Sequence, residues 1–183
     1  VTMHSTLALK TDGTIWSWGH NGSGRLGRGF DGGDYSDRKQ IGVSKNWESI
    51  SCGSHFCLAL QKDGSVYAWG TNGSGQLGDS TSNSLFSPKK VAGGFKQVYA
   101  GDQTSIGVKN DSTIWAWGRN DQGLYGDGTT NAYKYPVQTV SSKKWKFVSL
   151  GYIHVIAIQH DGTVWAWGNG TNGAVGDSTW NHR

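Results

Sequence analysis

One six-residue pattern, Thr/Ser-Ile/Val-Trp/Tyr-x-Trp-Gly, occurs four times in this chain of 183 residues. The copies occupy residues 14–19, 65–70, 113–118 and 163–168, so the second tryptophan recurs at intervals of 51, 48 and 50 residues. A fixed period of this length is typical of proteins in which each repeated unit buries its apolar face against the next unit. The repeat therefore limits the fold to a tandem array of similar units.

Composition indicates that these units consist of β-strands. The chain has 29 glycines, 10 tryptophans, only two prolines and a single glutamate, Glu48. Trp, Tyr, Val, Ile and Thr favour strands, whereas clusters of Gly, Asn, Asp and Ser favour turns. We therefore expect an all-β protein. No apolar run is long enough to predict a membrane span, and the missing start methionine suggests that the natural chain begins earlier.

The second copy shows the order of strands within one unit. Residues 47–52 and 56–60 are strand-like, and a tight hairpin turn at Asp63 and Gly64 leads into a third strand at 66–69. After a glycine-rich excursion, residues 87–91 contain a proline and therefore suit an edge strand. Four strands in this order describe one blade of a β-propeller.

Aligned on that copy, residues 1–183 form one domain of four repeats at 1–42, 43–91, 92–140 and 141–183. The first repeat lacks its first strand, and the last stops before its fourth strand. We therefore expect an arc of about four blades, of which the first and last are incomplete. Such an arc belongs to a longer chain, or a second copy or a protein partner completes it.

The third strand of each repeat predicts how the blades pack. Residues two apart on a strand share a face, so Trp16 and Trp18 face one side while Ile15 and Ser17 face the other. We expect the aromatic face to stack on the small-residue face of a neighbouring blade and to carry much of the stability. A carbohydrate-stacking platform is the weaker alternative for these tryptophans.

Residues 63–79 complete a longer motif, Asp-Gly-Ser-Val-Tyr-Ala-Trp-Gly-Thr-Asn-Gly-Ser-Gly-Gln-Leu-Gly-Asp. It resembles the repeat of the regulator of chromosome condensation family, and the resemblance extends over nearly the whole chain. It implies a seven-bladed propeller. The copies look most similar to bacterial and phage members, which favours an extracellular or virion location over a cytoplasmic one. Two departures are the family's Gly-x-x-His, present only at residues 151–154, and Arg28, which stands where later copies have aspartate.

The resemblance implies less about function, because one fold hosts many activities. We favour a non-catalytic binding or structural module that presents propeller loops to a protein or surface partner, as part of a larger bacterial or virion protein. The family's namesake implies an alternative, nucleotide exchange on a small GTPase. Glycan binding through exposed tryptophans is a third hypothesis.

No residue pattern predicts catalysis, a cofactor or a metal. The six histidines lack metal-ligand spacing, and no serine lies in a nucleophile elbow. Seven of the 13 acidic residues recur at turns, where we expect them to accept hydrogen bonds: Asp12, Asp63, Asp79, Asp111, Asp127, Asp161 and Asp177. We therefore predict that the protein is not an enzyme.

Two surfaces are candidate partner sites. The excursion of the first copy carries arginines and aromatic residues, the types that anchor interfaces: Arg25, Arg28, Phe30, Tyr35 and Arg38. The connections between repeats are basic, with Lys45, Lys89, Lys90, Lys143, Lys144 and Lys146. An ordinary solvated surface explains such lysines most simply. The functional hypothesis is a basic face for an acidic partner or nucleic acid, in a chain of net charge +4.

The two cysteines, Cys52 and Cys57, are too few for a disulfide framework. We expect buried free thiols that pack as small apolar groups, with a bridge between them as the weaker alternative.

Overall fold

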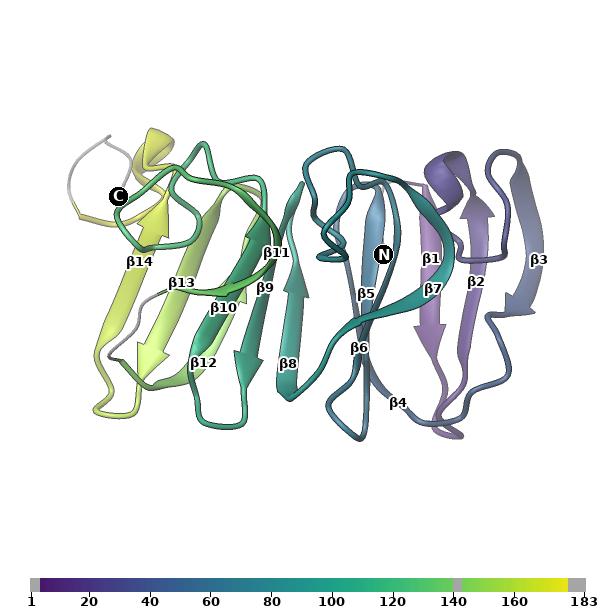
Figure 1. Ribbon diagram of the computed structural model, residues 1–183, viewed down its shortest axis with the longest axis horizontal. Coiled ribbons are helices and arrows are strands. Elements are labelled where there is room, and N and C mark those ends of the chain that lie inside the picture. Colours follow the sequence, from purple (N-terminus) through teal and green to yellow (C-terminus); the bar gives the residue numbers. More distant parts are fainter. Residues whose placement is uncertain (1–3, 140–142, 178–183) are drawn as a thin grey trace.

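The computed structural model of the protein describes residues 4–139 and 143–177. The end of the fourth repeat, at residues 180–183, lies outside them. The described strands form four antiparallel sheets that stand in a row (Figure 1). The first two sheets contain β1 (Ser5–Leu9), β2 (Ile15–His20) and β3 (Asp34–Gln40), then β4 (Trp47–Cys52), β5 (Phe56–Gln61), β6 (Val66–Gly70) and β7 (Leu85–Ala92).

The other two sheets follow the same order. They contain β8 (Phe95–Ala100), β9 (Thr104–Lys109), β10 (Ile114–Gly118) and β11 (Tyr133–Gln138), then β12 (Trp145–Leu150), β13 (His154–Gln159) and β14 (Val164–Gly168). Short 3-10 turns at Gly22–Gly24 (η1) and Thr171–Gly173 (η2) follow β2 and β14.

Strands that are adjacent in sequence pair within each sheet, so each sheet is one up-and-down blade. The strands β4, β8 and β12 lie at the inner edge, where β4 contacts β8 and β8 contacts β12. The strands β7 and β11, which contain Pro88 and Pro136, are edge strands as predicted. The predicted all-β fold of four propeller blades is therefore confirmed. Within the described residues, no strand precedes β1 in the first blade and none follows β14 in the fourth.

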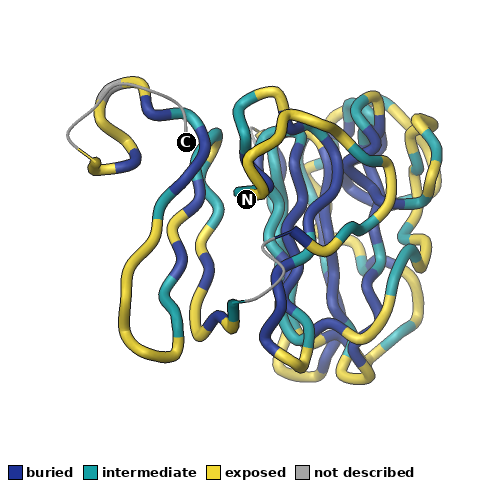
Figure 2. The backbone as a smooth tube through the Cα atoms, turned by 60° about the vertical axis from the view of Figure 1, so that its left-hand side comes forward, coloured by how far each residue is buried: buried dark blue, intermediate teal, exposed yellow. Residues whose placement is uncertain are grey.

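The hydrophobic core lies between blades rather than within one. In the middle cluster, Leu58, Val66 and Ala68 of the second blade pack against Phe95 and Trp117 of the third. Equivalent clusters join the first blade to the second and the third to the fourth. Figure 2 shows the corresponding buried stretches running along adjacent sheets. Each blade thus buries its small-residue face only when the next blade covers it.

The two aromatic positions of the repeated motif differ in burial. The second tryptophan is fully buried at Trp69 and Trp117, whereas the first position is half-buried at Trp115 and 44% exposed at Trp165. A lysine covers the ring at the first position, as where Lys109 Nζ lies 3.5 Å from the centroid of the Trp115 ring. The expectation that both positions pack between blades is met by full burial at the second position and by partial burial at the first, where Trp115 packs against the cluster between the second and third blades.

Cys52 and Cys57 form a disulfide, so the expectation of free thiols was wrong. The three-residue connection between β4 and β5 sets the register in which Cys52 lies opposite Cys57, with Cα atoms 4.1 Å apart. Opposite residues on antiparallel strands have neighbouring Cβ atoms. The pairing therefore follows from a register that the sequence alone did not define.

The repeated aspartates at the hairpin turns accept hydrogen bonds, as predicted. Asp111 Oδ1 accepts from the backbone N–H and the hydroxyl of Thr113, at 3.0 and 2.7 Å. The Thr113 hydroxyl oxygen in turn accepts from Trp115 Nε1–H at 3.0 Å. The same chain links Asp12, Thr14 and Trp16, and Asp161, Thr163 and Trp165. These bonds lower the pKa of the turn carboxyl groups, with Thr113 as the main cause at Asp111.

We expect the protein to lose stability as the pH falls below about 4. A carboxyl group with a lowered pKa in the folded state stabilises the fold above its unfolded pKa, and this contribution is lost as the pH falls through its folded pKa. The variant Asp111→Asn keeps an oxygen acceptor for Thr113 but cannot ionise. Its denaturant midpoint should therefore depend less on pH between about 6 and 2. An unchanged pH dependence would contradict this assignment.

Candidate functional site

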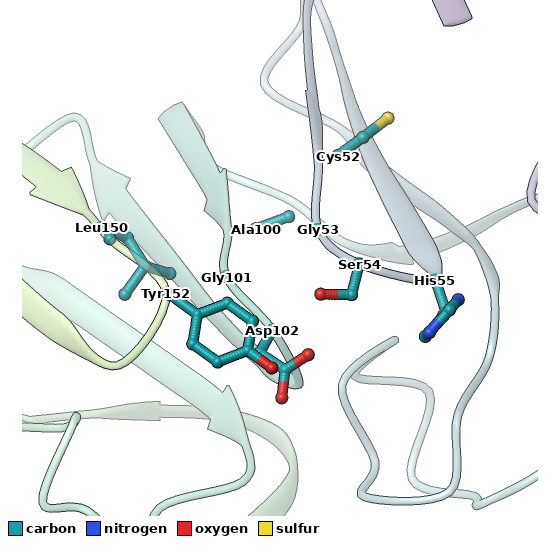
Figure 3. A pocket seen from close by; sticks show the side chains of 10 residues that line it. Cys52, Gly53, Ser54, His55, Ala100, Gly101, Asp102, Leu150 and Tyr152 are labelled. Atoms are coloured by element: carbon teal, nitrogen blue, oxygen red, sulfur yellow. The ribbon is translucent and has the colours of Figure 1, made fainter. Parts of the chain in front are cut away.

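The loops that follow the inner strands of three blades surround a pocket of about 480 Å³ (Figure 3). We call it the inner-loop pocket. Its lining residues are Cys52, Gly53, Ser54 and His55 of the second blade, Ala100, Gly101 and Asp102 of the third, and Leu150, Gly151 and Tyr152 of the fourth. It is therefore composite, because no single blade supplies it.

A glycine in each of the three loops allows the blades to approach one another closely. The amide N–H groups of Gly53, Gly101 and Gly151 each donate to a carbonyl three residues ahead, at 3.0, 2.8 and 2.8 Å. A Cβ atom on Gly53 would lie only 1.9 Å from the carbonyl oxygen of Gly101. Glycine at position 53 is therefore required for the close contact between these two loops, which both line the pocket.

Asp102 is the acidic group of the pocket. Its side chain is 14% exposed, and its carboxylate lies 3.9 Å from Arg119 Nη1 and 3.5 Å from Gln103 Nε2. Both contacts are long for a charged acceptor. Arg119 binds Asp121 more closely, with Nη2 at 2.5 Å from Oδ2, and this bond raises the pKa of Arg119 and lowers that of Asp121.

Arg25 connects the first blade to the rim of the pocket. Its Nε donates to the Gly22 carbonyl at 2.8 Å, Nη1 donates to the Ser54 carbonyl at 3.4 Å, and Nη2 donates to His55 Nδ1 at 2.6 Å. Burial and then the Arg25 charge lower the pKa of His55. The imidazole is therefore neutral at pH 7, and Nδ1 is an acceptor.

An asparagine organises each of the first three excursions. Asn72 Oδ1 accepts from the Leu77 amide at 3.0 Å, while its Nδ2 donates to Asp79 Oδ1 at 3.0 Å. Asn21 and Asn120 hold their loops in the same way. Asp79 then pairs with Lys89 of the outer strand, 3.2 Å away. These loops are therefore ordered by internal bonds.

In the first blade the charges of this ion pair are exchanged, because the excursion supplies the base, Arg28, and the outer strand supplies the acid, Asp37. Arg28 takes the place of Asp79, and its guanidinium binds Asp37 of the outer strand, with Nη1 at 3.4 Å from Oδ2 and Nη2 at 2.7 Å from the carbonyl oxygen. Its side chain is 2% exposed and also lies over the Tyr35 ring. The sequence could have indicated this ion pair, because Asp37 in the outer strand accompanies Arg28 in the same repeat.

The structure therefore does not bring the five predicted interface residues to one exposed patch. Arg25 and Arg28 are bonded within the fold, whereas Phe30 is 39% exposed and Arg38 is also exposed. Tyr35 is partly buried and packs edge-on to Phe30. A partner contact in this region remains a prediction, now confined to Phe30 and Arg38.

The predicted basic face is distributed over several elements. Three of its six lysines lie in connections between blades: Lys45, Lys143 and Lys144. The other three lie in strands, Lys89 and Lys90 in the outer strand β7 and Lys146 in the inner strand β12. Lys144 pairs with Asp111 at 3.4 Å, and Lys143 Nζ lies 3.1 Å from the centroid of the Trp165 ring. The expectation that all six lie in these loops was wrong. Binding of an acidic partner or nucleic acid stays a prediction.

The described residues, 4–139 and 143–177, contain no cluster of three His, Cys, Asp or Glu side chains suited to a metal ion. They also contain no helix with the length and apolarity needed to cross a membrane.

The profile of the Regulator of chromosome condensation (RCC1) repeat matches residues 12–60, 63–108 and 111–158. A second profile of the same description matches 47–76 and 95–124. These matches cover most of the chain. The chain belongs to the RCC1 repeat family. It is an RCC1 repeat module with a propeller fold.

Curated relatives match about half of this chain. The human E3 ubiquitin-protein ligase HERC2 is 39% identical over 88 residues, which are 48% of this chain and 2% of that protein. The Protein RCC2 homolog of Xenopus laevis is 38% identical over 95 residues, 47% of this chain and 17% of that protein. The match thus spans a small part of these relatives. They are eukaryotic, so the expected affinity with bacterial and phage members, and a surface or virion location, find no support here.

Solved structures match the whole fold. Human WBSCR16 superposes with a TM-score of 0.87 at 19% identity, over 100% of this chain and 50% of that one. Prp20p from Saccharomyces cerevisiae, described with its binding properties to Gsp1p and histones, gives a TM-score of 0.81 at 25% identity, over 99% and 47%. This chain therefore spans about half of an RCC1-type propeller.

Proposed function

We propose that this RCC1 chain is a non-catalytic protein-binding module that works within a larger propeller, whose further blades cover its end faces. The proposal rests on the face of the fourth blade that points away from the third blade. There Phe147, Ile156 and Val164 are 47%, 38% and 69% exposed. Figure 2 shows exposed segments along this sheet, which lies beside the label C.

The positions equivalent to Ile156 and Val164 are buried in the second and third blades, each of which is followed by another blade. Leu58 and Val66 in the second blade, and Ile106 and Ile114 in the third, are each 0% exposed. Aromatic side chains of the next blade cover these residues. Trp145 and Trp167 of the fourth blade, for example, pack on the third blade. Exposed contiguous apolar surface of this kind marks an interaction site. A further RCC1 blade is therefore the occupant that fits, and a seven-bladed ring is the expected assembly.

Thiol labelling tests this proposal in the full-length protein. Val164→Cys should react slowly with iodoacetamide without reductant, because the next blade covers it. The matched control Val43→Cys, at a position 93% exposed in a loop between blades, should react fast. Equal rates at the two positions would show that no blade covers this face.

A second candidate function is nucleotide exchange on a small GTPase. The likeness to Prp20p, whose description includes binding properties to Gsp1p, favours this candidate. Release of a labelled guanine nucleotide from a Ran-type GTPase tests it, and a rate unchanged by the protein would dismiss it. Glycan stacking is less favoured, because Trp69 and Trp117 are fully buried between blades.

A further inference from the structure

We infer that the inner-loop pocket binds an arginine side chain of a protein partner, with Asp102 as its ion-pair acceptor and the Tyr152 ring beside the guanidinium. The inference rests on the proposed protein-binding function and names the chemical group that this face of the propeller recognises. Three features support it: the unfilled hydrogen-bond acceptor capacity of Asp102, the negative charge of the pocket lining, and the apolar walls of the pocket.

Asp102 has acceptor capacity that its present contacts do not fill. An ionised carboxylate can accept about four hydrogen bonds. Within the described residues, the Asp102 carboxylate contacts Arg119 Nη1 at 3.9 Å and Gln103 Nε2 at 3.5 Å. A side chain that is 14% exposed is poorly solvated. A cationic group entering the pocket would supply the short bonds that this carboxylate lacks.

The lining is electrostatically selective for a cation. Asp102 is the acidic residue of the pocket lining. Burial and then the Arg25 charge lower the pKa of His55, which favours its neutral form. Asp102 therefore gives the lining a negative charge. Arg25 and Arg119 stand outside the lining. Arg25 bonds to His55, and Arg119 bonds to Asp121 and approaches Asp102 only to 3.9 Å. An anionic ligand would instead meet the Asp102 carboxylate.

The walls fit a long side chain with an apolar stem. Ala100 and Leu150 supply apolar surface, and Tyr152 is 63% exposed. Figure 3 shows Asp102 and Tyr152, which come from different blades, on the lining of this one pocket. A guanidinium is planar, stacks on aromatic faces and binds carboxylates with two parallel bonds. These properties favour arginine over lysine.

Fluorescence anisotropy with dye-labelled pentapeptides tests the inference in the full-length protein. The probes carry arginine, lysine or citrulline at the centre, and citrulline is the neutral isostere of arginine. We expect saturable binding of the arginine peptide and affinity about tenfold lower or worse for the citrulline peptide and for Asp102→Asn. The matched control Glu48→Gln removes an exposed carboxylate of β4 outside the pocket. It should change affinity by less than about twofold.

Three results would overturn the inference: equal binding of the citrulline peptide, equal binding of the lysine peptide, or unchanged affinity in Asp102→Asn. Thermal unfolding establishes that each variant is folded. If Asp102→Asn does not fold, Tyr152→Ala takes its place, because that ring is exposed and its loss should still weaken arginine binding. Failure here leaves the blade-addition proposal standing, because the labelling of Val164→Cys reports on a different face.

Discussion

Replacing Trp69 by alanine is expected to lower the free energy of unfolding by about 3–5 kcal/mol. The Trp69 side chain is fully buried and packs on Leu7, Ile15 and Ile41 of the preceding blade. Its removal leaves a cavity in the interface between two blades, where neighbouring strands cannot collapse freely. Denaturant unfolding followed by circular dichroism measures the loss. Trp165→Ala, at a position 44% exposed, should cost about 1 kcal/mol. Equal losses would mean that burial between blades does not determine the effect.

A comparison of two phenylalanine variants separates packing from hydrogen bonding. Trp69 Nε1 donates to the Arg25 carbonyl at 2.9 Å. The equivalent acceptor for Trp117 is the Gln76 carbonyl, but the Ser105 hydroxyl donates to it at 2.7 Å, and Trp117 Nε1 has no partner within the described residues. Trp69→Phe should therefore cost about 1 kcal/mol more than Trp117→Phe. Identical losses would contradict the hydrogen-bond assignment.

Periodicity and turn chemistry made the blades predictable from the sequence. Alternation in the third strand correctly separated Ile15 from Trp16, and the Asp63-Gly64 pair correctly marked a hairpin turn. These features depend on residues close together in the chain. Because each blade repeats them, the same local prediction applied four times and identified the fold.

The disulfide and the reversed ion pair depend on cross-strand register, which composition does not reveal. Cys52 and Cys57 face each other only because three residues connect β4 to β5. Arg28 looked like a partner residue because its type is common at interfaces, but Asp37 of the outer strand binds it. Both predictions were made from the type of the residue alone, whereas the neighbour on the adjacent strand determines its role.

The inner-loop pocket was missed for a different reason. The same glycine recurs in its three loops, but the residue after that glycine differs in each blade: Ser54, Asp102 and Tyr152. Repeat alignment emphasises what the copies share. The signal that could have found the pocket is the variation among inner loops, since a scaffold conserves its packing positions while its loops supply function.

Gly53→Ala is expected to destabilise the protein by about 3 kcal/mol and to distort the inner-loop pocket. The added Cβ would lie 1.9 Å from the Gly101 carbonyl oxygen and 2.6 Å from the Phe56 ring. A flexible side chain could move away, but the Gly101 turn is held by the bond from its amide to the Thr104 carbonyl at 2.8 Å. The second and third blades must therefore separate at their inner edge. Thermal and denaturant unfolding measure the cost.

The matched control is Gly93→Ala, in the connection between the same two blades. A Cβ on Gly93 would have no atom within 4 Å, and alanine lowers the entropy of the unfolded chain. Its stability should therefore stay within about 0.5 kcal/mol of the parent protein or rise slightly. If both alanine variants behave alike, the glycine contact at position 53 does not set the distance between blades. If only Gly53→Ala loses stability, the close contact between the inner loops stabilises the interface between these two blades. The same contact then also determines the shape of the pocket between them.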